Sequence, residues 1–138
     1  MKKISLKKKL KVLAVIPARK GSSLKNKNIK SYKGKPLIFH TIITALSSKL
    51  INKIVISTDS TKYKKLCIEQ FKNKIEIPFI RPRSISGKFS RDYDWIKHCL
   101  LFLKNEESYI PDVIVHLRPT TPNRDVKIID KAIIFFLN

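Results

Sequence analysis

Short apolar runs rich in β-branched residues alternate with amphipathic segments along almost the whole chain. Four runs have the composition of buried strands, at residues 11–16, 53–57, 77–80 and 112–117. Apolar residues three and four positions apart predict a helix after each run, over residues 36–49, 60–71, 92–103 and 125–136. Because parallel strands need long crossovers that helices supply, this order predicts an α/β fold. We expect a doubly wound, mostly parallel sheet with helices on both faces.

The length of 138 residues and the hydrophobic content of 43% suit one domain with a real core. We expect a basic N-terminal tail over residues 1–10 and one domain over residues 11–138. The first apolar run stops at Pro17, which makes it too short for a signal peptide, and no other run could span a membrane. Cys67 and Cys99 lack metal-site spacing. These features predict a cytoplasmic protein with reduced thiols and no membrane partner.

The formal net charge is +20, and no acidic residue precedes Asp59. A field of this sign attracts polyanions, so nucleic acid, anionic membranes and nucleoside triphosphates are all candidate partners. Over-use of lysine along the whole chain by coding bias explains the charge equally well. The sequence has no aromatic-rich RNA-binding motif, zinc finger or basic recognition helix. We therefore expect no nucleic-acid partner, although charge alone does not decide the function.

Polar loops follow the predicted strands, and ligands of open α/β sheets bind at the carboxyl ends of the strands. The first loop reads PARKGSSLKNKN. Gly21 allows close approach of the backbone to a ligand, and the hydroxyls and charges come from Arg19, Lys20, Ser22, Ser23, Lys25 and Lys27. A triphosphate is a plausible occupant, and a merely solvated loop is an equally good reading. The loop matches neither the Walker A pattern nor the dinucleotide fingerprint.

Several longer motifs occur in a fixed order: VIPARKGSS, KNKNI, GKPLIFHTI, IVISTDS, PFIRP and HLRPTTPNRD. Together they resemble the acylneuraminate cytidylyltransferase family over nearly the whole chain from Val12 onward. The resemblance implies a Rossmann-like nucleotidyltransferase fold of the glycosyltransferase-A type. It also implies transfer of CMP from CTP to a sialic-acid-like nonulosonic acid, with release of pyrophosphate and a requirement for magnesium.

The resemblance further implies roles for individual residues. Arg19 and Lys27 would act catalytically on the triphosphate, where Lys27 neutralises charge as pyrophosphate leaves. The implied nucleotide-binding residues are Arg19, Lys20, Gly21, Ser22, Ser23, Lys27, Asn28, Arg81, Ser90 and Arg118. The implied sugar-binding residues are Arg118, Thr120 and Thr121.

Other polar residues have competing structural explanations. Arg118 could bind a phosphate or a sugar carboxylate, or could simply pair with Asp92. For Asp59 we favour capping of the next helix over a ligand role. For His98 we favour a core or boundary position over a general base.

Three positions depart from the common family pattern, with Lys88 in place of Asp, Asp92 in place of Ser and Arg118 in place of Gln. These changes affect the specificity for base and sugar. Family members also continue beyond the length of this chain with a dimer-forming segment and the aspartates that hold magnesium. We therefore expect no metal ligands here, with the Mg²⁺ ligands in a missing C-terminal part, and a possible homodimer. The alternative function is a truncated, inactive nucleotide-binding module or one piece of a split enzyme.

Overall fold

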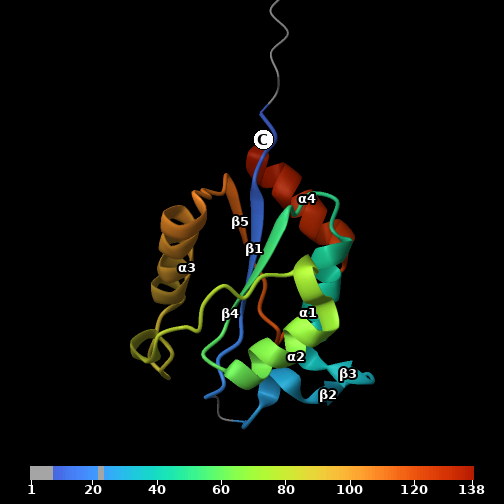
Figure 1. The fold of residues 1–138 in the computed structure, drawn as a ribbon. Coiled ribbons are helices and arrows are strands. Elements are labelled where there is room, and N and C mark those ends of the chain that lie inside the picture. The colour runs from blue at the N-terminus through green and yellow to red at the C-terminus, as the bar shows by residue number, and fades with distance from the viewer. Residues whose placement is uncertain (1–7, 22–23) are drawn as a thin grey trace, which may run out of the picture.

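A computed structural model describes residues 8–21 and 24–138 and contains a three-stranded parallel sheet (Figure 1). The strand order is β4-β1-β5, with β1 (Val12–Pro17) at the centre, β4 (Lys53–Ser57) on one side and β5 (Val113–His116) on the other. Residues 12–16 of β1 are all buried, because this strand is covered by helices on both faces. The predicted first, second and fourth strands are therefore confirmed.

Helices cover both faces of the sheet, as the sequence predicts (Figure 1). One face carries α1 (Leu37–Ser47), α2 (Thr61–Phe71) and α4 (Val126–Leu137), and the other face carries α3 (Asp92–Glu107). Side chains alternate along β1, so that Ala14 and Ile16 pack with the first layer while Leu13 and Val15 pack with the second. The core therefore lies in two layers on either side of the central strand.

The predicted strand at residues 77–80 is wrong. This segment joins the sheet through one bridge only, in which Glu76 N donates to Ile54 O at 2.9 Å and Ile56 N donates to Glu76 O at 3.0 Å. A parallel ladder would next need the N–H of Pro78, which proline lacks. The ladder therefore ends at Glu76, and Ile77 and Phe79 pack into the core without strand pairing while Ile80 is exposed.

The loop after β1 is more structured than the sequence predicts. It contains a 3₁₀ turn (Lys27–Ile29) and a small antiparallel hairpin of β2 (Ser31–Tyr32) and β3 (Lys35–Pro36). Lys33 and Gly34 turn the hairpin with positive φ angles of 47° and 83°. Two further 3₁₀ turns lie at Lys72–Lys74 and Arg83–Ile85.

Helix starts follow local capping chemistry. Ser60 Oγ accepts from Tyr63 N at 3.1 Å and so caps α2. Asp92 is the first residue of α3, which agrees with the predicted helix start at residue 92. The cap is Arg91, whose N–H donates to the Asp94 carboxylate at 3.1 Å. The α3 helix also runs four residues beyond its predicted end at residue 103, to Glu107.

The two cysteines and the apolar end of α4 bear on behaviour in solution. Cys67 and Cys99 are free and buried, and burial raises the pKa of each thiol to about 12. The last turns of α4 expose large apolar side chains, with Phe135 85% and Phe136 73% accessible. In the described part of the chain, no helix combines the length and apolar character that crossing a bilayer requires.

Candidate functional site

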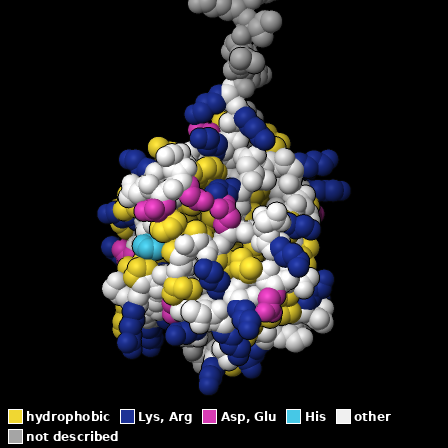
Figure 2. Space-filling view, viewed as in Figure 1, with side chains coloured by type: hydrophobic (Ala, Val, Ile, Leu, Met, Phe, Trp, Pro, Cys, Tyr) yellow, Lys and Arg dark blue, Asp and Glu magenta, His cyan; other side chains and the backbone are white. Residues whose placement is uncertain are grey.

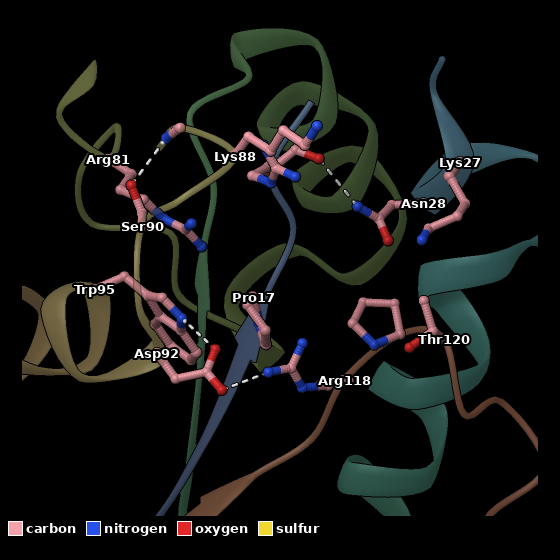
Figure 3. A pocket seen from close by; sticks show the side chains of 13 residues that line it. Pro17, Lys27, Asn28, Arg81, Lys88, Ser90, Asp92, Trp95, Arg118 and Thr120 are labelled. Atoms are coloured by element: carbon pink, nitrogen blue, oxygen red, sulfur yellow. Dashed lines mark hydrogen bonds and ion pairs between the residues drawn. The ribbon is translucent and has the colours of Figure 1, made fainter. Parts of the chain in front are cut away.

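A polar pocket of about 390 Å³ lies at the carboxyl ends of β1 and β5, where the sheet predicts a ligand site (Figure 3). Three parts of the chain surround it: the loop after β1, the segment from Arg81 to the start of α3, and the turn after β5. Its lining residues are Pro17, Arg19, Lys27, Asn28, Arg81, Gly87, Lys88, Ser90, Asp92, Trp95, Arg118, Pro119 and Thr120.

The loop after β1 is held in place by side chains that bond to its backbone. Asn28 is buried, and its Nδ2 donates to Arg19 O at 3.2 Å. The Lys20 amide donates to Asp59 Oδ1 at 2.8 Å. Asp59 therefore fixes this loop, and its predicted role as a helix cap is wrong, because Ser60 caps α2 instead. These bonds place Arg19 and Lys27 at the pocket.

Arg81 is a buried wall of the pocket. Its residue is only 4% exposed, Nε donates to Ser57 Oγ at 3.0 Å, and Nη2 donates to Ser57 O at 2.7 Å. The guanidinium also stacks over the Trp95 ring at 5.2 Å. Burial lowers the pKa of Arg81 to about 10, which leaves it cationic at neutral pH. The same side chain therefore supports β4 and contributes charge to the pocket.

Asp92, Trp95 and Arg118 form a connected group beside Arg81. Trp95 Nε1 donates to Asp92 Oδ1 at 3.1 Å, and Arg118 Nη2 donates to Asp92 Oδ2. Burial opposes ionisation of Asp92, but the bond from Trp95 and the charge of Arg118 outweigh it, so its pKa lies below the ordinary value. The predicted alternative in which Arg118 pairs with Asp92 is thus realised, with Arg118 still at the pocket surface.

The electrostatics of the pocket favour a polyanion. Five cationic side chains line it, against the single carboxylate of Asp92. Among the residues that the structure describes, neither Arg19 nor Lys27 has an ion-pair partner. Lys and Arg also occur all around the face of the molecule seen in Figure 2, so net charge alone does not mark the site. The cluster of five cations around one pocket marks the site instead, because a phosphate chain there would meet several donors at once.

The structure brings together most of the predicted site residues, and seven of them line the pocket: Arg19, Lys27, Asn28, Arg81, Ser90, Arg118 and Thr120. Lys20, Gly21 and Thr121 lie on the adjoining loops outside the lining, and Ser22 and Ser23 lie outside the described residues.

Sequence reasoning identified Lys88 and Asp92 as departures from the family pattern that affect specificity, but it did not name them, or Trp95, as site residues. The polar loop and helix start that follow the third apolar run would have been the signal, since that loop also ends at the pocket side of the sheet. His98 packs edge-on against Phe79 at 4.5 Å and does not line the pocket, which confirms the predicted boundary position.

Comparison with known proteins decides the family. A cytidylyltransferase family profile matches residues 13–136, which is nearly the whole chain. The chain belongs to the cytidylyltransferase family. The N-acylneuraminate cytidylyltransferase of Escherichia coli is 33% identical over 124 residues, covering 89% of this chain and 27% of that protein. The CMP-N,N'-diacetyllegionaminic acid synthase of Legionella pneumophila is 35% identical over 125 residues, covering 90% of this chain and 52% of that protein.

Solved structures agree with this cytidylyltransferase fold. A CMP:2-keto-3-deoxy-manno-octonic acid synthetase, determined as a complex with CTP, superposes with a TM-score of 0.71 at 21% identity. The match covers 91% of this chain and 46% of that one. The chain thus spans between about a quarter and a half of the length of these relatives. The expected Rossmann-like nucleotidyltransferase fold is confirmed.

The family resemblance implies a magnesium ion, which prefers carboxylate and other oxygen ligands. In residues 8–21 and 24–138, no cluster of three or more His, Cys, Asp or Glu side chains could hold a metal ion. The one carboxylate of the pocket, Asp92, already bonds to Trp95 and Arg118. These residues do not fit a magnesium ion by themselves.

Proposed function

We propose that the pocket binds CTP and that this chain supplies the nucleotide-binding part of a transfer of CMP to a nonulosonic acid. The observation that carries the proposal is the enclosed cluster of cations at the carboxyl ends of β1 and β5. A nucleoside triphosphate carries close to four negative charges and so matches this cluster. Membership of the cytidylyltransferase family supports cytidine as the nucleoside.

In the proposed reaction the anomeric hydroxyl of the sugar acid attacks the α-phosphorus of CTP. A bond forms between that oxygen and the phosphorus, the bond from the α-phosphorus to the bridging oxygen breaks, and the hydroxyl proton passes to solvent. Negative charge builds on the departing pyrophosphate. Arg19 and Lys27, which have no ion-pair partner in the described part of the chain, would neutralise that charge.

The base and the sugar would lie beside the phosphates. Asn28 is fixed by its bond to Arg19 O, and the turn in which Thr121 N donates to Arg118 O at 3.3 Å borders the opposite side. These two elements would shape the base and sugar subsites. The nonulosonic acid is proposed as a class, which includes the acylneuraminic and legionaminic acids named for the relatives.

The test is calorimetric titration of CTP, with ATP and UTP as competitors. We expect Lys27→Ala to weaken CTP binding at least about tenfold, because a charge-assisted phosphate contact contributes on the order of 1.5–3 kcal/mol. Lys30→Ala is the matched control, since Lys30 is exposed, carries the same charge and does not line the pocket. Equal affinity of wild type and Lys27→Ala would remove Lys27 from the site.

A second candidate function is nucleotide binding without turnover. The observation that favours it is the lack of a metal-holding carboxylate cluster among the described residues. A pyrophosphate-release assay with CTP and several nonulosonic acids separates the two candidates. CTP binding with release supports the transferase, whereas CTP binding without release supports the binding module.

A further inference from the structure

The strand β5 is an open edge of the sheet. Among the residues that the structure describes, β5 pairs with β1 alone. Val113 N and Leu117 N donate to carbonyl oxygens on the β1 side, at 3.2 Å and 3.0 Å. Because successive residues of a strand turn their backbone groups to opposite edges, the N–H and C=O groups of Ile114 and His116 face away from β1. Two donors and two acceptors are therefore available to another strand.

The sequence of β5 is that of an interior strand. Edge strands that stay exposed usually carry charged residues or proline that discourage further pairing, and β5, with the sequence VIVH, carries neither. The opposite edge differs, because the bridge between Val55 and Glu76 covers β4. An apolar run on both faces is typical of a parallel strand with neighbours on both sides. β5 therefore has the character of a strand that lacks one neighbour.

Apolar grooves flank the open edge, and Figure 1 shows α3 and α4 on the two faces of the sheet beside β5. One groove, of about 520 Å³, lies between β5 and α4, where Ile128 and Phe136 line it. The other, of about 410 Å³, lies between β5 and α3, where Leu101 and Ile110 line it. Ile114 lines both grooves, so they meet at the strand edge. A strand added there would bury apolar side chains on both of its faces, one set in each groove.

The linings of the two grooves are basic as well as apolar. Lys97 and Lys104 line the α3 groove. Arg124 lines the α4 groove together with Asp125, whose carboxylate caps α4. A second copy of the chain would bring these cations against their own equivalents, whereas a strand flanked by acidic residues would pair with them. The charge therefore favours a different polypeptide segment over self-pairing at this edge.

We propose that the β5 edge and its two grooves bind a strand from the part of the cytidylyltransferase fold that lies outside these 138 residues. That strand carries apolar side chains on both faces and acidic residues at its ends. The extent of the relatives supports this occupant, because the chain covers 52% of the Legionella pneumophila synthase and 46% of the superposed synthetase structure. About half of each relative thus has no counterpart in this chain. The inference rests on family membership and not on CTP binding, and so goes beyond the proposed function.

The test mixes the full chain with the part of the Legionella pneumophila synthase that lies outside its match, produced as a separate polypeptide. Calorimetry measures association, and NMR measures the hydrogen exchange of single amides. We expect a complex in which the amides of Ile114 and His116 exchange at least about tenfold more slowly than in the free chain. The amides of Val113 and Leu117 should be protected in both states, because they bond to the β1 side. Higher salt should weaken the complex.

The variant Ile114→Pro tests the backbone pairing. The Ile114 N–H points away from β1, so proline removes a bond to the added strand and none to β1. We expect association at least about tenfold weaker than for Ile114→Val, because a carbonyl of the added strand would lose its donor. Ile114→Val is the matched control, since it keeps the N–H and loses only one methylene. Circular dichroism of both free variants checks that they fold.

Ile128→Asn and Leu101→Asn test the two grooves separately, with no change in the strand itself. Both residues are exposed in the free chain, at 65% and 47%, so the variants should fold. Each should weaken association about fivefold or more, because an apolar contact with the added strand is lost. Ile134→Asn is the matched control, since Ile134 is 50% exposed on α4 and lies outside the groove lining.

Three results would overturn the inference: no association of the wild type with the probe, equal association of Ile114→Pro and Ile114→Val, or a dimer of this chain that excludes the probe. The last result would assign the edge to a second copy. CTP titration of the free chain is a separate measurement. Its failure would defeat the proposed function and leave the docking result readable, so the two failures are distinguishable.

Discussion

Replacement of Arg81 by alanine should destabilise the fold as well as the site. Arg81 is 4% exposed as a residue, and its guanidinium makes two hydrogen bonds to Ser57, at 3.0 Å and 2.7 Å. Ser57 is itself fully buried, so its hydroxyl oxygen would lose its partner away from water, while its carbonyl oxygen would keep only the bond from Ala18 N at 2.9 Å. The cation over the Trp95 ring would be lost as well.

The size of the effect follows from these contacts. A hydrogen bond from a charged donor contributes about 1.5–3 kcal/mol, and the cost of burying the cation offsets part of two such bonds. We expect a net loss of about 2–4 kcal/mol in the free energy of unfolding. With about 2.1 cal/mol/K of unfolding entropy per residue, a chain of 138 residues loses about 3 °C of Tm per kcal/mol. The Tm should therefore fall by about 6–12 °C.

Urea unfolding followed by circular dichroism measures this change. Arg83→Ala removes the same charge from an exposed position two residues away and should change the unfolding free energy by no more than about 0.5 kcal/mol. If Arg81→Ala lost less than about 1 kcal/mol, Arg81 would not be the structural wall described above, and the contacts to Ser57 would contribute little.

Three further outcomes are expected. Burial raises the pKa of Cys67 and Cys99 from 9.0 to about 12, so neither thiol should react with Ellman's reagent in the native state, and rapid labelling without urea would contradict their burial. Burial lowers the pKa of His98 below 6.5, so the unfolded state binds the proton more readily and the free energy of unfolding should fall as the pH drops through 6.5. His98→Gln should reduce this fall, which is measured as the change of the urea midpoint with pH. The exposed apolar end of α4 should cause concentration-dependent self-association, which Phe136→Lys should weaken in sedimentation experiments, and equal association of both proteins would exclude that surface.

Much of the fold could be predicted because the periodicity of the chain is strong. Residues 12–16 are apolar on both faces and form the central strand, and the caps of α2 and α4 are visible as Ser60 and Asp125. The failures have local causes. The apolar residues around Pro78 predicted a strand, but Pro78 ends the strand pairing there. The two-residue strands of the β2–β3 hairpin are too short to show the alternation typical of a strand.

The site was predicted in part because charged loops and family motifs coincide. Arg19, Lys27 and Asn28 were found from the first loop, since that loop directly follows the central strand. The pairing of Arg118 with Asp92 was predicted as one of two alternatives, and the structure shows it. The bond from Trp95 to Asp92 and the place of this group at the pocket were not predicted, because they depend on how α3 approaches the end of β5.

The central claim is that the cations beyond β1 enclose the triphosphate of a cytidine nucleotide. Titration of CTP against wild type and Lys27→Ala, with Lys30→Ala alongside, tests this claim most directly. The account predicts saturable CTP binding by wild type and Lys30→Ala, at least about tenfold weaker binding by Lys27→Ala, and a loss of affinity as salt increases. Absence of saturable CTP binding by wild type, or equal affinity of all three proteins, would contradict it.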